Sequence, residues 1–225
     1  MPRPPRNPER SPRRAGALSR RARVWLSLTT AMTTVGGTLL LLEGRPAPRL
    51  DGLALAPLAA TGSPATLESI FATRAPRQDG RWHGIVIHHS GSAVGSPASI
   101  GAQHEARGFR GLGHHFVIGN GSGMGDGDLH VGYRWLDQLP GAHAGGPDGA
   151  WHNLNSLSIC LVGDGNRRPF TAAQLRRLVE LTSVLCRELG LPRDRVYLHS
   201  DLAPTRDPGM LFPAVEFAEQ VRGGN

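Results

Sequence analysis

The histidines of this sequence are concentrated in one part of the chain. All ten lie between His83 and His199 in a chain of 225 residues. Imidazole is the side chain used most often for metal binding and for proton transfer near neutral pH. His88 stands near the end of the apolar run 84–89, and His199 follows the short apolar run 196–198. We therefore ask whether these two residues belong to one metal site.

A carboxylate follows His199 at a short interval. Asp207 lies eight residues later, inside the proline-bounded turn 203–209. If the two apolar runs are neighbouring strands that end at one edge of a sheet, His88 and His199 meet there, and the turn folds Asp207 back to them. Two imidazoles and one carboxylate, with a fourth position for water, is the ligand count of a catalytic zinc site. From spacing alone, the alternative of hydrogen-bonded histidines at strand ends stays open.

The surrounding sequence predicts the elements that would position these residues. Apolar runs predict strands, and 3.6-residue periodicity with capping residues and terminal glycine or proline predicts helices. The predicted strands are 84–89, 115–118, 128–135, 157–162 and 196–198, and the predicted helices are 97–107, 171–189 and 213–221. Because strands and helices are intermixed, we expect an α/β fold: a single domain with a central mixed β-sheet flanked by helices.

The N-terminal part of the chain has the composition of a targeting segment. Residues 1–23 are rich in arginine, and the following stretch, 24–42, is uncharged and about as long as a membrane-spanning helix. We predict a basic cytoplasmic or signal region followed by a membrane anchor or a cleaved export signal, with a buried core helix as the alternative. An Ala-, Pro- and Gly-rich linker is expected over 43–80, and an extracytoplasmic catalytic domain over 81–225, either membrane-anchored or secreted.

Charge and cysteine content exclude several classes of protein. The net charge is +7, but residues 1–49 contain ten Arg against two acidic residues, whereas residues 50–225 are close to neutral. A nucleic-acid-binding domain needs its positive charge on the folded surface, so we expect no nucleic-acid partner. The chain has no lysine. Cys160 and Cys186 are too few for a disulfide scaffold, and whether they pair is left open.

Four stretches resemble a known family. They are Ile85–Ser90, Gly111–Ile118, Asn155–Gly163 and His199–Gly209. In this order they are similar to segments of the zinc N-acetylmuramoyl-L-alanine amidases of the phage-lysozyme and peptidoglycan-recognition-protein family. The resemblance covers the chain from about residue 81 to residue 209, which is more than half of its length.

The resemblance implies a set of roles. The family's zinc ligands fall on His88, His199 and Asp207, and the implied cofactor is Zn²⁺. The implied reaction is hydrolysis of the amide between N-acetylmuramic acid and L-alanine, so the expected partner is peptidoglycan. The alternatives are a catalytically impaired peptidoglycan-binding module of the same fold, or a metal hydrolase of that fold that acts on another amide.

Four further residues are assigned by the same resemblance. His114 occupies a position where many members have Tyr, and Thr205 occupies a position where members have Lys or Thr. Both are predicted to be catalytic, and the identity of the general base stays open. His143, in a glycine-rich loop, and Asn155, before a core strand, are predicted to contact substrate. The alternatives are simple exposure for His143 and a loop-fixing role for Asn155.

Overall fold

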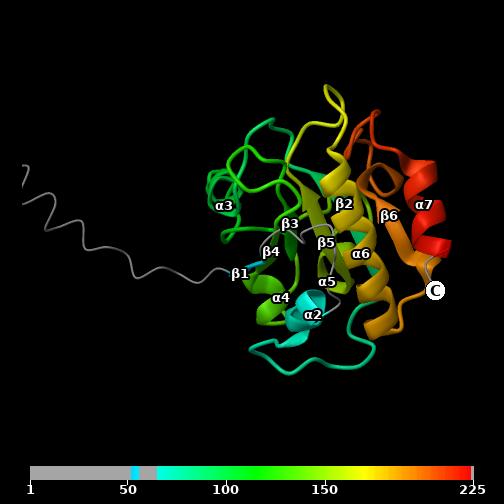
Figure 1. The fold of residues 1–225 in the computed structure, drawn as a ribbon. Helices are drawn as coiled ribbons and strands as arrows, with labels where there is room; N and C mark the ends of the chain where they lie inside the picture. The colour runs from blue at the N-terminus through cyan, green and yellow to red at the C-terminus, as the bar shows by residue number, and fades with distance from the viewer. Residues whose placement is uncertain (1–51, 56–64, 224–225) are drawn as a thin grey trace, which may run out of the picture. The chain divides into compact units, whose positions relative to one another are not determined.

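A single mixed β-sheet organises the part of the chain that the structure describes. In this computed structural model, that part comprises residues 52–55 and 65–223, all within one compact unit, Leu50–Asn225. The sheet has six strands in the order β1-β4-β3-β5-β2-β6 (Figure 1). The strands are β1 (Gly52–Leu55), β2 (Gly84–His89), β3 (Phe116–Ile118), β4 (Leu129–Gly132), β5 (Ser156–Leu161) and β6 (Val196–Leu198). The predicted α/β fold with a central mixed sheet is confirmed.

Four neighbouring strands run in the same direction. β3 pairs in parallel with β5, β5 with β2, and β2 with β6, whereas β4 and β1 continue the sheet antiparallel. Parallel strands bring their carboxyl ends to one edge of a sheet. The residues that follow β2 and β6 therefore lie close together.

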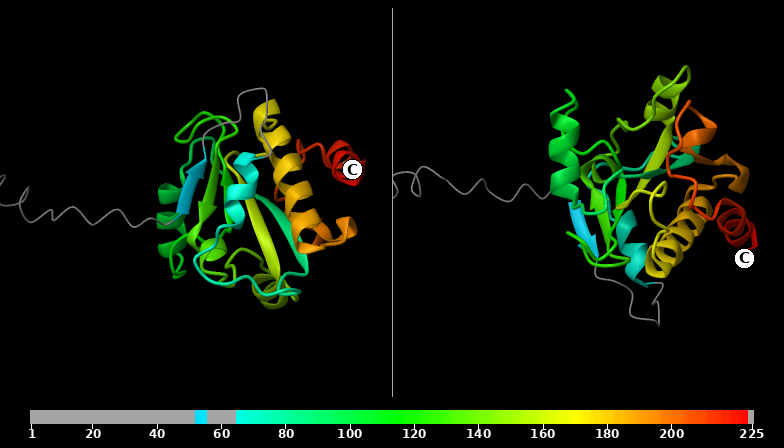
Figure 2. Two further views of the ribbon diagram at one scale, coloured as in Figure 1. Left: turned by 60° about the horizontal axis from the view of Figure 1, so that its bottom comes forward. Right: turned by 90° about the horizontal axis from the view of Figure 1, so that it is seen from above.

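Helices and short helical turns connect the strands and lie around the sheet. They are α2 (Ala65–Glu68), α3 (Pro97–Glu105), α4 (Tyr133–Leu136), α5 (Gly149–Asn155), α6 (Ala172–Leu189) and α7 (Ala214–Gly223), with 3-10 turns η1 (Ser69–Phe71), η2 (Arg193–Arg195) and η3 (His199–Asp201). The two views of Figure 2 show the longest helix, α6, lying across one face of the sheet. It begins at the capping box of Thr171 and Gln174 and ends at Gly190, which adopts the left-handed conformation. Both ends agree with the sequence prediction.

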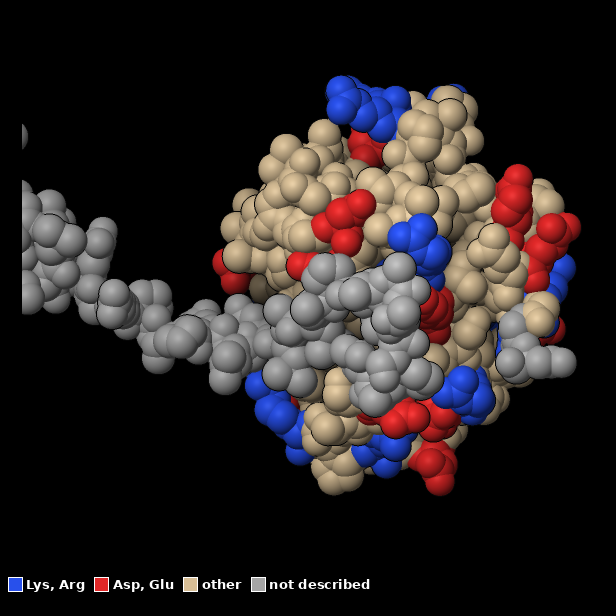
Figure 3. Space-filling model, viewed as in Figure 1, with Lys and Arg blue, Asp and Glu red and all other residues tan. Residues whose placement is uncertain are grey.

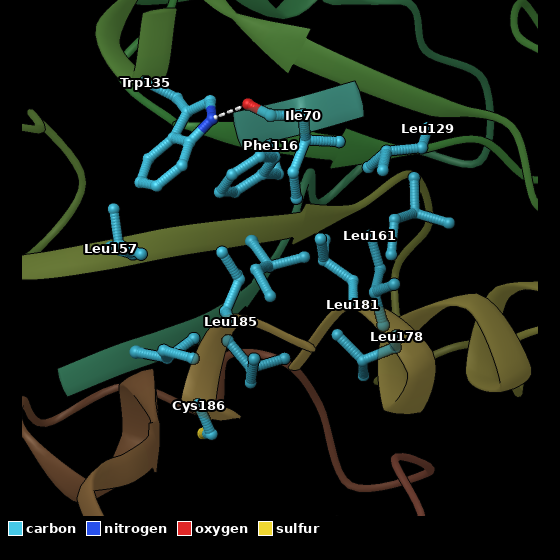
Figure 4. Close-up of a cluster of buried hydrophobic side chains, with 14 of the residues drawn as sticks. Ile70, Phe116, Leu129, Trp135, Leu157, Leu161, Leu178, Leu181, Leu185 and Cys186 are labelled. Carbon is cyan, nitrogen blue, oxygen red and sulfur yellow. Dashed lines mark hydrogen bonds between the residues drawn. The ribbon is translucent and has the colours of Figure 1, made fainter. Parts of the chain in front are cut away.

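The two faces of the sheet differ in chemistry. On β5, Leu157, Ile159 and Leu161 belong to the large apolar cluster that includes α6, and Figure 4 shows α6 leucines packed toward the strands. The alternate residues of β5, among them Ser156 and Cys160, point to the other face because side chains alternate along a strand. His88 pairs in register with Cys160, so it shares that second face.

The region predicted as strand 128–135 changes conformation half-way. β4 ends at Gly132, and α4 begins at Tyr133. Trp135 is fully buried, and its indole N–H donates to the carbonyl of Ile70 in the α6-side core (Figure 4). After Gly132, only Tyr133 and Trp135 continue the apolar alternation, and in the structure they belong to a single helical turn in which Arg134, Trp135 and Leu136 are all buried. The strand prediction is wrong for residues 133–135.

Part of the predicted linker belongs to the fold. β1, α2 and η1 lie within 43–80, and β1 pairs with β4 at the edge of the sheet. The domain therefore includes residues before position 81. The predictions for 1–23 and 24–42 lie outside the described residues. No helix within residues 65–223 has both the length and the apolar character needed to cross a bilayer.

The two cysteines and the surface charges bear on two of the predictions made from the sequence. Cys160 and Cys186 are both buried free thiols and belong to separate apolar clusters, so they do not pair. On the face drawn in Figure 3, acidic and basic side chains are interspersed.

Candidate metal centre

The fold brings His88 and His199 to the same edge of the sheet. His88 is the fifth of the six residues of β2, and His199 follows the last residue of β6 directly. These strands are parallel neighbours, with Ile87 paired to Leu198. The backbone N–H of Ser200 donates to the carbonyl of Asp207 at 2.8 Å, which closes the turn that returns the carboxylate to the two histidines.

One carboxylate oxygen lies between the two imidazoles. Asp207 Oδ2 is 2.9 Å from His88 Nδ1 and 2.8 Å from His199 Nδ1. The other oxygen, Oδ1, accepts a hydrogen bond from the backbone N–H of His89 at 2.6 Å. One possible ligand atom from each of His88, His199 and Asp207 lies within 4.8 Å of the other two. The structure thus brings together the three residues that the sequence analysis predicted as ligands.

Burial and hydrogen bonding set the charges at this cluster. Burial lowers the pKa of His88, and this effect outweighs the opposing hydrogen bond and charge of Asp207. Burial alone would raise the pKa of Asp207, but the contacts of its carboxylate with the imidazoles of His199 and His88 outweigh burial and hold it well below its ordinary value. An ionised carboxylate and a neutral imidazole are the forms that bind metal ions.

The donor set suits zinc. Zn²⁺ takes nitrogen and oxygen ligands at about 2 Å, so two ligands of one ion lie within about 4 Å of each other. Asp207 Oδ2 lies within this distance of both His88 Nδ1 and His199 Nδ1. Two histidines and one carboxylate leave a further position for water or substrate, as in catalytic zinc sites. His88, His199 and Asp207 therefore fit the ion that the family resemblance implies.

Thr205 lies in the turn that carries Asp207. Its side chain is exposed, and its Oγ1 accepts a hydrogen bond from the backbone N–H of Asp207 at 3.2 Å. The hydroxyl proton is not used by that contact. The structure places Thr205 two residues from a candidate ligand, and its catalytic role stays a prediction.

His114 is buried beside His88. The ring centroids of His114 and His88 are 5.0 Å apart, and the ring of His104 lies 5.2 Å from His114 on another side. Burial, followed by the nearby His88 and His104, lowers the pKa of His114 well below its ordinary value. Among the described residues, His114 Nδ1 has no hydrogen-bond partner. A neutral imidazole with a free nitrogen therefore stands next to the candidate metal ligands.

His143 contacts the back of His88. Its Nδ1 lies 3.0 Å from His88 Nε2, and its Nε2 lies 3.4 Å from the carbonyl oxygen of Ser156. Burial, followed by the nearby imidazoles of His88, His115 and His114, lowers the pKa of His143 well below its ordinary value. The structure thus brings His143 into the cluster, where protein atoms already contact both of its ring nitrogens. His143 is half-buried there, and its contact with substrate stays a prediction.

Asn155 lies at the opposite end of the strands. It is the last residue of α5, and its side-chain amide donates to the carbonyl of Trp151 at 2.9 Å. The backbone carbonyl of Asn155 accepts a hydrogen bond from the backbone N–H of His83, the residue that precedes β2. His88 is near the other end of that strand. The structure does not bring Asn155 to the metal cluster, and its contacts are those expected of the loop-fixing alternative, whereas substrate contact stays a prediction.

Two residues with structural roles around the site were missed by the sequence analysis. Asn153 Oδ1 accepts hydrogen bonds from the backbone N–H groups of His143 and Ala144, at 2.7 and 2.9 Å. The buried guanidinium of Arg134 donates to three backbone carbonyls. These are Leu112 at 2.7 Å, Pro140 at 2.5 Å and Arg110 at 3.1 Å. Neither residue stands in a pattern that predicts such contacts, because every partner is set by the fold.

The region of the chain that contains the candidate ligands is similar to known amidases. The sequence model of the N-acetylmuramoyl-L-alanine amidase family matches residues 78–210. A curated relative, the 1,6-anhydro-N-acetylmuramyl-L-alanine amidase AmpD of Haemophilus influenzae, is 33% identical over 89 residues, which cover 33% of this chain and 48% of that protein. The chain thus spans about half the length of this relative.

Solved structures show the same fold. The endolysin N-acetylmuramoyl-L-alanine amidase LysCS from Clostridium intestinale is 25% identical, with a TM-score of 0.53, over 67% of this chain and 91% of that chain. The amidase LysC from the same organism has the same identity and TM-score over 93% of its own chain. Because the family match spans more than half of the sequence, and includes His88, His199 and Asp207, the chain belongs to the N-acetylmuramoyl-L-alanine amidase family.

Proposed function

We propose that this protein is a zinc-dependent hydrolase that cleaves the amide between N-acetylmuramic acid and L-alanine in peptidoglycan. The observation that carries the proposal is the convergence of His88, His199 and Asp207 in a chain of the amidase family. Zinc held by these residues supplies a polarised substrate carbonyl and a water of lowered pKa. The ionised carboxylate of Asp207 offsets part of the charge of the ion.

The neighbouring side chains supply hydrogen bonds to the reacting groups. Hydrolysis of an amide develops negative charge on the carbonyl oxygen, and fixed donors stabilise that charge. His114 has a buried imidazole nitrogen without a protein partner among the described residues, and Thr205 has an exposed hydroxyl. We assign His114 to proton transfer or hydrogen bonding at the reacting amide, and Thr205 to a neutral hydrogen bond. Both roles rest on position beside the ligands and on the family resemblance.

The location of the protein is part of the proposal. Peptidoglycan lies outside the cytoplasmic membrane, and the Arg-rich residues 1–23 followed by the uncharged stretch 24–42 favour export or anchoring. We propose an extracytoplasmic protein that is either membrane-anchored or secreted. Detection of the tagged protein in membrane, periplasmic or medium fractions supports this location, whereas confinement to the cytosol contradicts it.

Digestion of purified peptidoglycan by the full-length chain tests the reaction. Mass spectrometry should detect free stem peptides that begin with L-alanine, together with glycan strands that have lost them. Asp137→Ala is a matched control, because Asp137 pairs with the exposed Arg74 away from the cluster. Binding to peptidoglycan without release of peptides would support the binding-module alternative. A zinc-loaded chain that neither binds nor cleaves peptidoglycan contradicts the proposal and favours another amide substrate.

A further inference from the structure

We infer that His143 is a positioning residue of the metal centre, which holds the ring of His88 so that His88 Nδ1 faces the ion. The inference rests on the proposed zinc site and assigns a role to a residue that the sequence suggested as a substrate contact. Its basis is two successive hydrogen bonds. One joins the carbonyl oxygen of Ser156 to His143 Nε2, and the other joins His143 Nδ1 to His88 Nε2.

The direction of these two hydrogen bonds follows from the chemistry of the groups that they join. A backbone carbonyl only accepts, so the Nε2 of His143, 3.4 Å from Ser156 O, carries the proton of a neutral ring. His143 Nδ1 is then the acceptor and receives the N–H of His88 Nε2 at 3.0 Å. The tautomer of each ring is thus assigned from its hydrogen-bond partners. His88 Nδ1, on the other side of the ring, is directed to Asp207 and is the nitrogen available to a metal ion.

The ring of His143 is fixed by its surroundings rather than left to move. A Cβ on Gly141 would lie 2.3 Å from His143 Cδ2 and 2.8 Å from Nε2, so the ring occupies the space that a side chain at 141 would need. Asn153 holds the backbone of the same loop by accepting from His143 N and Ala144 N and by donating to Ala144 O at 2.9 Å. Protein contacts therefore hold His143 in this position.

The same loop acts differently on the other histidine ligand. The backbone N–H of Gly145 lies 3.4 Å from His199 Nε2 and is a donor. Within this loop, as the structure describes it, His143 is the residue that offers an acceptor to a ligand ring, so a substitution of His143 acts through His88. In metal sites, an acceptor on the far nitrogen of a ligating histidine fixes the ring and its tautomer, and its loss typically lowers metal affinity 10- to 100-fold.

A positioning role and a substrate-binding role make different predictions. If His143 contacts substrate, its removal raises KM and leaves the zinc affinity unchanged. If it positions His88, its removal weakens zinc binding in the absence of any substrate. Zinc affinity therefore separates the two roles without a measurement of activity.

The test uses the full-length chain stripped of metal and titrated with Zn²⁺ against a chromophoric chelator. We expect His143→Leu, which removes the acceptor, to weaken zinc binding about 10- to 100-fold. His143→Gln should retain most of the affinity, because its amide oxygen can accept from His88 and its amide N–H can donate to Ser156. His83→Leu is the matched control, since His83 is exposed and precedes β2. Wild-type affinity in His143→Leu, or equal losses in the Leu and Gln variants, would overturn the inference.

A second measurement on the wild-type chain covers the case in which His143→Leu does not fold. The chain is loaded with ¹¹³Cd and labelled with ¹⁵N-histidine, and NMR identifies the nitrogen of His88 that couples to the metal. Coupling to Nδ1 with a proton on Nε2 is the expected result, whereas coupling to Nε2 contradicts the inference. Neither measurement uses peptidoglycan, so failure to cleave the wall polymer and failure of the role of His143 are distinguishable.

Discussion

At the scale of single residues, the candidate site depends on one shared carboxylate. Asp207 contacts the Nδ1 atoms of His88 and His199 through Oδ2 and the backbone of His89 through Oδ1. Each of its oxygens therefore has a protein contact before any ion is considered. Removing this side chain leaves two imidazoles and one backbone N–H without their common partner.

Thr205→Ala tests the hydroxyl beside Asp207. Thr205 Oγ1 accepts from the N–H of Asp207, but its proton is available for substrate. We expect kcat for peptidoglycan cleavage to fall about 100- to 1,000-fold, the range for loss of a donor to a developing oxyanion, with little change in bound zinc. Thr205→Ser should restore most of the rate. An unchanged kcat in Thr205→Ala removes Thr205 from the mechanism.

At the scale of elements, Arg134 connects the segments that carry the histidines around His88. From α4 it donates to Leu112 O, two residues before His114, and to Pro140 O, three residues before His143. It also donates to Arg110 O. A single guanidinium fixes both segments because its fork presents several N–H groups in one plane.

Arg134→Lys tests this connection. An ammonium group cannot reproduce the three contacts, so at least one buried carbonyl loses its partner, at a cost of about 1–3 kcal/mol. We expect the free energy of unfolding of the metal-free chain to fall by that amount in urea denaturation. Arg74→Lys, in an exposed ion pair with Asp137, is the control and should change little. Equal stability of Arg134→Lys and wild type would contradict the role.

Local signals explain which elements were predictable from sequence. The limits of α6 followed from Thr171, Gln174 and Gly190, because capping depends on residues close in the chain. The meeting of His88 and His199 followed from parallel strand ends. The contacts of His143 were not predictable, since they depend on how loops distant in sequence pack, whereas the local contacts of Asn155 agree with the loop-fixing alternative. β1 was missed because a short edge strand in a Gly- and Pro-rich region has no distinctive pattern.

At the scale of the whole molecule, the domain keeps many histidines neutral in its interior. Burial is the largest cause that lowers the pKa of each of six histidines: His88, His104, His114, His115, His143 and His152. Burial lowers the pKa of His115 to about 3. Its ring nitrogens contact protein atoms, Nδ1 the hydroxyl oxygen of Ser158 and Nε2 the carbonyl oxygen of Leu139. Folding therefore disfavours protons on these side chains.

Acidification should destabilise the metal-free chain. Histidines of the unfolded chain bind protons as the pH falls through about 6.5, whereas a native histidine with a lower pKa stays neutral. The stability contributed by each such group is present above pH 6.5 and is lost as the pH falls toward the native pKa. The loss is about 1.4 kcal/mol per pH unit for each proton taken up only on unfolding.

Urea denaturation at pH 7.5 and pH 5.5 in the presence of a chelator measures this effect. We expect a lower free energy of unfolding at pH 5.5 and a smaller difference in His115→Gln. His83→Gln, which removes an exposed imidazole, is the control. Equal or greater stability at pH 5.5 contradicts the expectation.

We propose that His88, His199 and Asp207 together bind one zinc ion that the chain uses to cleave an amide. Elemental analysis of the purified full-length wild type, Asp207→Ala and Asp137→Ala, paired with cleavage of peptidoglycan by the same samples, tests it most directly. We expect about one zinc per chain and active cleavage in wild type and Asp137→Ala, with zinc and cleavage both lost in Asp207→Ala. Wild-type cleavage by metal-stripped Asp207→Ala would contradict it.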